Sequence, residues 1–158
     1  MLKKGDKAPD FTTVDESGNP FKLSDYLGQK VVLYFFPRDF TPGCTTQACS
    51  LRDGFESIDT AGMKVFGISG GAAELHVKFI KRYNLPFHIL VDSDLKIAEL
   101  YDSRSKLSTL GFGTKRVTYL INEEGVIEEI IGGNMGVEKI DVGNHAEQIM
   151  RVWNLKLS

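Results

Sequence analysis

The sequence has only two cysteines among 158 residues, no excess of basic side chains, and no apolar run near the roughly 20 residues that a transmembrane helix needs. Two cysteines are too few for a disulfide-rich scaffold, and with three scattered histidines they show no spacing typical of a metal site. The net charge of −2 and the pI of about 5.9 are not those of a nucleic-acid or membrane-surface binder. We therefore expect no metal, no cofactor, no nucleic acid and no membrane as partners.

The first residues also lack the apolar segment of a secretory signal, because residues 1–6 supply lysines but no hydrophobic run. This predicts a cytoplasmic location, where a permanent disulfide between the two cysteines is disfavoured. An apolar fraction of 42% and a charged fraction of 25% are ordinary for a globular protein. At this length we expect one domain over residues 1–158, with a core of its own.

Apolar runs and turn-forming residues alternate along the chain in the pattern of an α/β protein. Two short apolar stretches around a turn predict an N-terminal β-hairpin over residues 11–23. Further strands are predicted at 30–36, 64–69, 87–91, 116–121 and 126–131, and helices at 42–61, 72–83, 94–101 and from about residue 144 onward. This order predicts a thioredoxin-like three-layer fold, with a mixed central sheet flanked by helices, parallel in its early strands and antiparallel at the final hairpin.

Both cysteines lie in one stretch, residues 37–49, directly after the most apolar run of the chain. With Thr41 as N-cap and Pro42 as first helical residue, Cys44 is expected in the first helical turn. Unpaired N–H groups and the positive end of the helix macrodipole favour a reactive thiolate at such a position. Gly43 is expected to let a small substrate approach the backbone closely. The alternative, a buried structural cysteine, leaves the Thr-Pro-Gly approach unexplained.

A thiolate that attacks an O–O bond expels hydroxide or alkoxide, so hydrogen-bond donors are needed where that negative charge develops. The local candidates are the N–H groups of Gly43 and Cys44 and the hydroxyl of Thr41. A cation would help further. The residues alone leave two arginines open, Arg38 in the same stretch and Arg116 at the start of a late strand.

Cys49 follows Cys44 by five residues, a spacing that an intact helix does not bridge. Five residues rotate a side chain by about 140° and place the Cα atoms roughly 8 to 9 Å apart, beyond the ~7 Å limit for a disulfide. A bridge would require the first turns to unwind, and the poor helix formers Thr45, Thr46 and Gly54 favour unwinding. We interpret the cysteines as a redox pair coupled to local unfolding. The alternative is that Cys49 only fills one side of the helix.

Several motifs resemble those of the peroxiredoxins. The pattern Pro37-x-x-x-Thr41-x-x-Cys44 resembles their peroxidatic signature, and residues 41–49 with Leu51-Arg52-Asp53 are similar to the bacterioferritin-comigratory, or PrxQ, subfamily. The likeness extends to residues 5–11, 66–69 and 116–125. It therefore spans nearly the whole chain.

The resemblance implies a thioredoxin-fold peroxidase that reduces hydrogen peroxide and organic hydroperoxides. Cys44 would be the peroxidatic cysteine and pass through a sulfenic acid, which Cys49 would resolve as an intrachain disulfide. Thr41 would orient the peroxide and Pro37 would shield the site. Arg116 matches the late-strand arginine that stabilises thiolate and peroxide in this family, which favours it over an arginine of the cysteine stretch. The resemblance also implies reduction by thioredoxin, or by glutaredoxin in its place, and a monomer, with a dimer as the alternative.

Two positions depart from the subfamily pattern, since many members have Glu in place of Gln47 and Asp in place of Gly71. Two other functions compete with the peroxidase. A thioredoxin-like thiol–disulfide oxidoreductase would have a Cys-x-x-Cys motif and a proline before the late strand, where this chain has Cys-x4-Cys and residues 114–116 without proline. A redox-sensing or chaperone protein would use the same cysteine, and the sequence leaves that additional role open.

Overall fold

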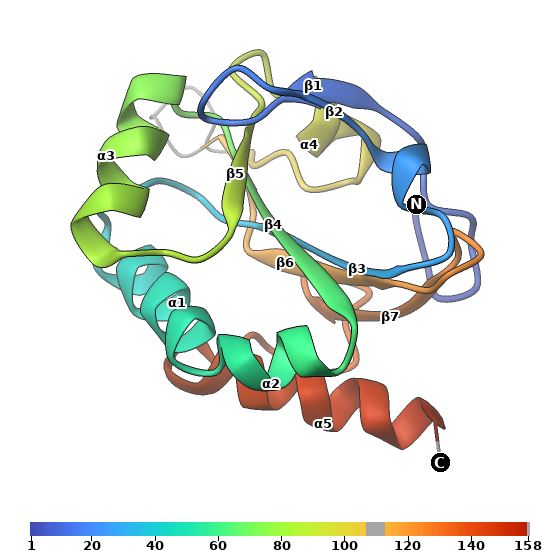
Figure 1. Cartoon of the computed structure of the whole chain (residues 1–158). Coiled ribbons are helices and arrows are strands. Elements are labelled where there is room, and N and C mark those ends of the chain that lie inside the picture. Colours follow the sequence, from blue (N-terminus) through green and yellow to red (C-terminus); the bar gives the residue numbers. More distant parts are fainter. Residues whose placement is uncertain (107–112, 158) are drawn as a thin grey trace.

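The computed structural model describes residues 1–106 and 113–157 (Figure 1). Within them, the central sheet consists of β5 (His88–Val91), β4 (Met63–Ser69), β3 (Lys30–Phe35), β6 (Val117–Ile121) and β7 (Ile127–Gly132), in that spatial order. The pairs β3–β4 and β4–β5 are parallel, whereas β3–β6 and β6–β7 are antiparallel. The predicted mixed sheet, parallel early and antiparallel at the final hairpin, is confirmed.

The N-terminal hairpin is also confirmed. It consists of β1 (Thr12–Val14) and β2 (Pro20–Lys22), which pair antiparallel and are followed by the 3-10 turn η1 (Leu23–Tyr26). The hairpin lies against the β5 edge of the large sheet, because Thr13 Oγ1 donates to the carbonyl of Val91 at 2.6 Å. Phe21 of β2 also packs with Val31 and Leu33 of β3 in one core cluster, so the hairpin covers one face of the sheet as well.

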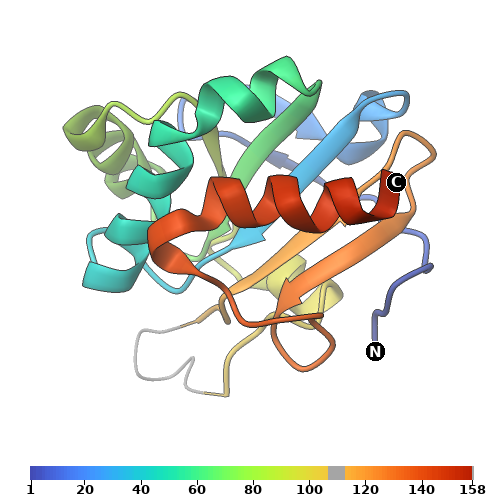
Figure 2. The same cartoon turned by 90° about the horizontal axis from the view of Figure 1, so that it is seen from below.

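Helices complete the outer layers. They are α1 (Pro42–Asp53), α2 (Phe55–Thr60), α3 (Ala73–Tyr83), α4 (Lys96–Leu100) and α5 (His145–Leu157), the last preceded by the 3-10 turn η3 (Val142–Asn144). Figures 1 and 2 show α1, α2 and α5 on one face of the sheet and α4 with the N-terminal hairpin on the other, while α3 stands beside the β5 edge. The described helices include none that is long and apolar enough to cross a membrane.

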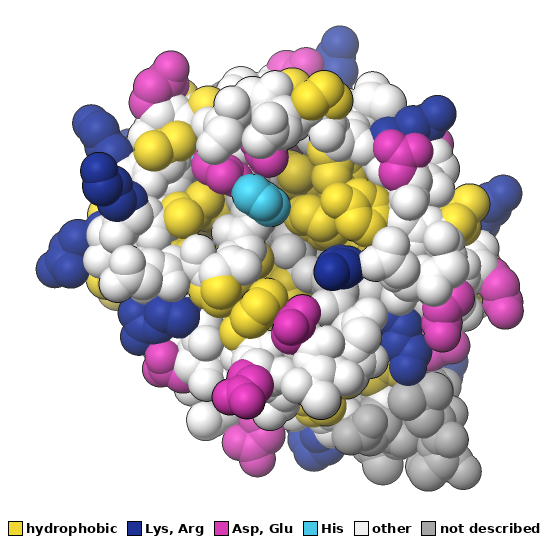
Figure 3. Space-filling model, in the orientation of Figure 1, with side chains coloured by type: hydrophobic (Ala, Val, Ile, Leu, Met, Phe, Trp, Pro, Cys, Tyr) yellow, Lys and Arg dark blue, Asp and Glu magenta, His cyan; other side chains and the backbone are white. Residues whose placement is uncertain are grey.

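The core has two parts, one on each face of the sheet. Alternate residues of β3 point to opposite faces, so that Val31 and Leu33 join one cluster and Val32 and Tyr34 join the other. Since helices or the hairpin cover both faces, the strand is apolar without interruption. On the face shown in Figure 3, acidic and basic side chains are interspersed with apolar patches rather than gathered by sign.

The structure corrects the single helix predicted over residues 42–61. It contains two helices, α1 and α2, separated at Gly54, whose φ of −101° and ψ of 10° leave the helical range. A Cβ atom at Gly54 would lie 2.4 Å from Cβ of Ala146 on α5. The close packing of α5 against the α1–α2 junction therefore requires a residue without a side chain at position 54, and the chain bends there.

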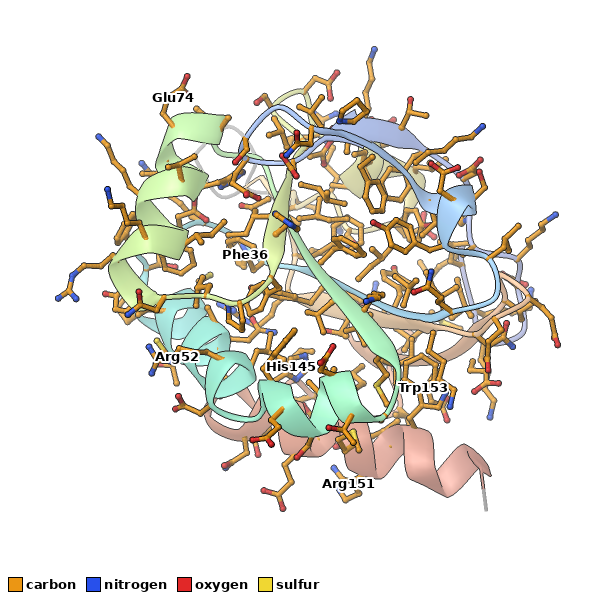
Figure 4. All side chains as sticks on the ribbon, viewed as in Figure 1. Phe36, Arg52, Glu74, His145, Arg151 and Trp153 are labelled. Carbon is orange, nitrogen blue, oxygen red and sulfur yellow. The ribbon has the colours of Figure 1, made fainter. Side chains whose placement is uncertain are left out.

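His145 begins α5 with a fully buried imidazole, and Figure 4 shows that it lies between this helix and the sheet. Its Nδ1 is 2.9 Å from Oε1 of Gln148 and its Nε2 is 2.8 Å from Oγ1 of Thr118. Because the amide oxygen only accepts, Nδ1 carries the proton and Nε2 accepts from the threonine hydroxyl. Burial lowers the pKa of His145 from 6.5 to about 4, so the ring is neutral in the folded protein at neutral pH.

This histidine predicts a specific loss of stability in acid. Between pH 6.5 and about 4 the unfolded chain binds a proton at His145 that the folded chain does not, so the free energy of unfolding falls as the pH falls through this window. The full effect is about 3 kcal/mol. We expect the stability advantage of the wild type over His145→Gln to shrink by this order between pH 7 and pH 4 in urea unfolding. A constant difference between the two proteins would contradict the assignment.

Candidate active site

Cys44 lies in the first turn of α1, as the sequence predicts. Thr41 is the N-cap, with φ −72° and ψ 152°, and Pro42 is the first helical residue. The hydroxyl of Thr41 makes no capping bond and instead donates to the carbonyl of Arg38 at 2.8 Å. First-turn geometry leaves the N–H groups of Gly43 and Cys44 without intrahelical acceptors. The backbone therefore presents donors next to the cysteine.

The sulfur of Cys44 is buried and contacts a cation. The side chain of Cys44 is 1% exposed, and Nη2 of Arg116 donates to its Sγ at 3.3 Å. Arg116 directly precedes β6, and Val117 pairs with Phe35 near the end of β3. The antiparallel register thus brings the guanidinium to the point where the chain leaves β3 for the cysteine loop. A cation in this position stabilises negative charge that develops during attack by the sulfur.

The two arginines that the residues left open have different surroundings. Arg38 has an exposed side chain, and the contact described for it near the site is made by its backbone carbonyl. Arg116 is half-buried and makes hydrogen bonds through both terminal nitrogens. Among the described residues, Arg116 and not Arg38 therefore contacts the cysteine.

Gln47 holds the other side of the same guanidinium. Its Oε1 accepts from Nη1 of Arg116 at 2.6 Å, and the residue is 0% exposed. Its Nε2 has no hydrogen-bond partner within residues 1–106 and 113–157. Because Gln47 is three residues after Cys44, both side chains lie on one face of α1, and Arg116 bridges them. From the sequence, Gln47 was noted only because many subfamily members have Glu at this position. Its place on the apolar face of the helix could have indicated that the side chain is buried and needs a polar partner.

Gly43 makes room for this bridge. A Cβ atom at Gly43 would lie 3.0 Å from Nη2 of Arg116, closer than such contacts normally come. Sequence reasoning expected a substrate to use the space beside this glycine. In the structure, the neighbour at close range is the guanidinium of Arg116.

The loop of residues 37–41 is fixed to α3 by a pair that sequence reasoning missed. Nδ1 of His76 lies 2.5 Å from Oδ2 of Asp39, and both side chains are fully buried. The pattern predicted His76 only as a member of the apolar side of a helix. A histidine on the apolar side of a helix is buried and needs a polar partner, so the position of His76 could have indicated such a partner. Pro37 begins the loop, is half-buried, and accepts a long 3.5 Å hydrogen bond from Ser69 Oγ at its carbonyl.

Hollows adjoin the site on two sides. One, of about 410 Å³, is lined by Pro37 and Arg38 together with residues 70–72. Another, of about 360 Å³, lies beside Arg116 and is lined by Gly132, Lys139 and their neighbours. Cys44 is not among the residues that line either hollow, so the hollows reach the loop and the arginine beside the sulfur rather than the sulfur itself.

Cys49 is half-buried on the intact α1, and both cysteines are free thiols. The structure thus holds the two residues at the spacing that the sequence argument used. Within α1, the hydroxyls of Thr46 and Ser50 donate to the carbonyls of Pro42 and Gln47. Such bonds between side chain and helix backbone offer the backbone an alternative partner and slightly weaken a helix.

Comparison with known proteins places these residues in a family context. Residues 4–130 match the AhpC/TSA family. Peroxiredoxin Bcp of Bacillus subtilis (strain 168) is 44% identical over 78% of this chain and 81% of its own length. The putative peroxiredoxin bcp of Coxiella burnetii is 38% identical over 94% and 97% of the two chains. Chloroplastic peroxiredoxin Q of Sedum lineare is 42% identical over 87% and 73%.

Solved structures show the same fold. The crystal structure of peroxidoxin BcpB from Mycobacterium tuberculosis superposes with a TM-score of 0.85, at 27% identity and over 98% of each chain. A PrxQ variant from Xylella fastidiosa gives a TM-score of 0.87 at 23% identity, over 100% of this chain and 99% of its own. The predicted thioredoxin-like architecture is confirmed.

The neutral carboxamide of Gln47 leads to a first prediction for the site. In Gln47→Glu, a carboxylate would neutralise Arg116 and repel a thiolate at Cys44, so we expect alkylation of Cys44 by iodoacetamide at pH 7 to slow by about five- to tenfold. Mass spectrometry separates this reaction from that of Cys49. Gln29→Glu adds the same charge at an exposed position near the start of β3 and should alkylate like the wild type. Equal rates in all three proteins would contradict the role of Gln47.

Proposed function

This chain belongs to the AhpC/TSA family and is a thiol peroxidase related to the Bcp and PrxQ peroxiredoxins, and from that premise we propose that Cys44 attacks the hydroperoxide and Cys49 resolves the product. The substrates are hydrogen peroxide and organic hydroperoxides. The observation that carries the assignment is the hydrogen bond from Arg116 to the sulfur of Cys44 in the first turn of α1.

In the first step, the thiolate of Cys44 forms an S–O bond while the O–O bond of the hydroperoxide breaks. The electron pair leaves with the alkoxide or hydroxide, which takes up a proton, and Cys44 becomes a sulfenic acid. The developing negative charge is stabilised by the Arg116 guanidinium at 3.3 Å from the sulfur and by the first-turn N–H groups of Gly43 and Cys44. These donors are in place before the reaction begins.

Thr41 orients the peroxide. Its hydroxyl proton is directed to the carbonyl of Arg38, so the oxygen lone pairs remain available to accept from the O–H of the substrate. Pro37, half-buried at the start of the loop, shields the site from water. The positions of the two residues beside the first turn of α1 support these roles.

Resolution requires α1 to open. The thiolate of Cys49 attacks the sulfur of the sulfenic acid, an S–S bond forms, and the oxygen leaves as water. Because intact helical geometry keeps the Cα atoms beyond disulfide distance, the first turns unwind before this step. A dithiol such as thioredoxin, or glutaredoxin, then returns two electrons and restores both thiols. A reducing compartment such as the cytoplasm suits this cycle.

Burial of the sulfur favours a peroxidase over a thiol–disulfide oxidoreductase. Cys44 is 1% exposed, so a disulfide in another protein has no direct access to it while α1 is folded. A hydroperoxide is much smaller than a protein partner, so burial of the sulfur restricts its approach less. The redox step with a protein partner therefore comes after unwinding, as re-reduction of the disulfide.

The assignment predicts that Cys44→Ser abolishes turnover. Hydroperoxide consumption coupled to NADPH, thioredoxin reductase and thioredoxin should fall to the rate without added protein, because a serine hydroxyl is a far weaker nucleophile than a thiolate. Undiminished turnover in this variant would overturn the mechanism.

Cys49→Ser should separate the first step from the second. We expect this variant to consume about one equivalent of hydroperoxide per chain and then stop, because the sulfenic acid has no resolving thiol. Mass spectrometry should find a sulfenic or over-oxidised Cys44 and, in the oxidised wild type, a Cys44–Cys49 disulfide. A wild-type protein that cycles without this disulfide would show that resolution occurs elsewhere.

A further inference from the structure

Within the described residues, the buried pair of Asp39 and His76 is only partly hydrogen-bonded. One hydrogen bond of 2.5 Å joins Nδ1 of His76 to Oδ2 of Asp39, and both side chains are 0% exposed. Oδ1 of Asp39 and Nε2 of His76 have no hydrogen-bond partner among the described residues. Burying such groups costs free energy that one bond only partly offsets. Two apolar side chains of similar size would fill the space at lower cost, so packing alone does not explain the pair.

Gly71 leaves space for this pair. A Cβ atom there would lie 3.3 Å from Cε1 of His76 and 3.8 Å from Oδ2 of Asp39. Gly71, where many members of the subfamily have Asp, thus lies directly against the His76 imidazole and the Asp39 carboxyl group. The two side chains contact each other, and neither is exposed to solvent.

A second contact holds the next residue of the loop. Phe40 has a φ of 66°, a left-handed conformation that is strained for an aromatic residue. Its ring packs against those of Phe79 and Tyr83, with centroids 5.1 and 6.2 Å apart. His76, Phe79 and Tyr83 share one face of α3, being three and four residues apart. One helix face therefore holds two consecutive loop residues.

The same helix also holds the far end of α1. Nη1 of Arg52 donates to the carbonyl of Tyr83 at 2.8 Å, while Asp39 lies two residues before the N-cap Thr41. Figure 4 shows Arg52 on the part of α1 that faces α3. Because the loop continues directly into the first turn, unwinding that turn pulls on the residues that α3 holds. The contact of Asp39 with His76 is a buried hydrogen bond that ties the loop before this turn to α3.

The geometry points to Asp39 and His76 as positioning residues that form a latch, a contact that ties the loop to α3 and so keeps the first turns of α1 folded. This inference rests on the proposed function, in which α1 unwinds for resolution. The latch sets how the sulfenic acid of Cys44 divides between two reactions. In one, Cys49 attacks the sulfur, the S–S bond forms and water leaves. In the other, a second hydroperoxide transfers an oxygen atom to the still-folded site, its O–O bond breaks, alcohol leaves, and the sulfur becomes a sulfinic acid.

Breaking the latch should shift both the opening of α1 and this division. In Asp39→Ala and His76→Phe, we expect the Thr45 amide, which donates to the Thr41 carbonyl, to exchange with deuterium about tenfold faster, as loss of a buried hydrogen bond implies. The sulfinic fraction per turnover at high hydroperoxide should fall by a similar factor, because the disulfide forms sooner. Amide exchange and mass spectrometry measure the two effects independently.

Conservative and distant variants make the test specific. Asp39→Asn retains an oxygen that accepts from His76, so its exchange and sulfinic fraction should lie between those of Asp39→Ala and the wild type. This variant also serves if the alanine variant fails to fold. Asp59→Ala on α2 and His88→Phe on β5 remove the same side-chain types at exposed positions and should behave like the wild type.

Two results would overturn the latch. One is wild-type exchange at Thr45 together with a wild-type sulfinic fraction in both disruptive variants. The other is faster exchange of amides throughout α5 as well, since this would indicate general destabilisation. Failure of the wild type to consume hydroperoxide would instead overturn the proposed function, and the exchange of the Thr45 amide would still test the latch.

Discussion

The guanidinium of Arg116 lies between the sulfur of Cys44 and the amide oxygen of Gln47, and the rest of the site is arranged around this contact. The antiparallel register of β6 on β3 delivers the arginine to the end of the strand from which the cysteine loop leaves. Gly43 provides the space that the guanidinium needs. The central sheet therefore acts as the rigid support, and the helix that it faces supplies the sulfur.

The same helix must satisfy two opposing requirements. Its first turn has to be folded, because only then do backbone donors and Arg116 surround the sulfur of Cys44. It also has to open if Cys49 is to reach that sulfur. Poor helix formers and hydroxyls bonded to the helix's own carbonyls weaken the fold of α1, whereas contacts to α3 and α5 support it from outside. The stability of this segment is thus decided mainly by its neighbours.

Buried polar side chains join several elements of the fold to one another. Gln47, Asp39 with His76, and His145 are all fully or almost fully buried, and each joins elements that are distant in the chain. His145 is fully hydrogen-bonded, as a structural residue should be. Gln47 and the Asp39–His76 pair, next to the cysteine, retain atoms without partners among the described residues. Tyr34 Oη and Thr114 Oγ1 also lack partners among the described residues, so unpaired buried atoms occur beside the cysteine without being confined to it.

The sequence by itself determined the strands, both hairpins and the place of Cys44 in the first turn of a helix, because apolar periodicity and capping residues act over a few neighbouring positions. It also required unwinding for a Cys44–Cys49 bridge, since helix geometry depends only on spacing. Tertiary structure alone decided the break at Gly54, where α5 packs too closely for a side chain. It likewise brought Arg116 to Cys44 across 72 residues, a contact that the family resemblance favoured and the residues alone left open, and it paired Asp39 with His76 across 37 residues. Local patterns do not encode such contacts, because their geometry exists only once the sheet has brought distant segments together.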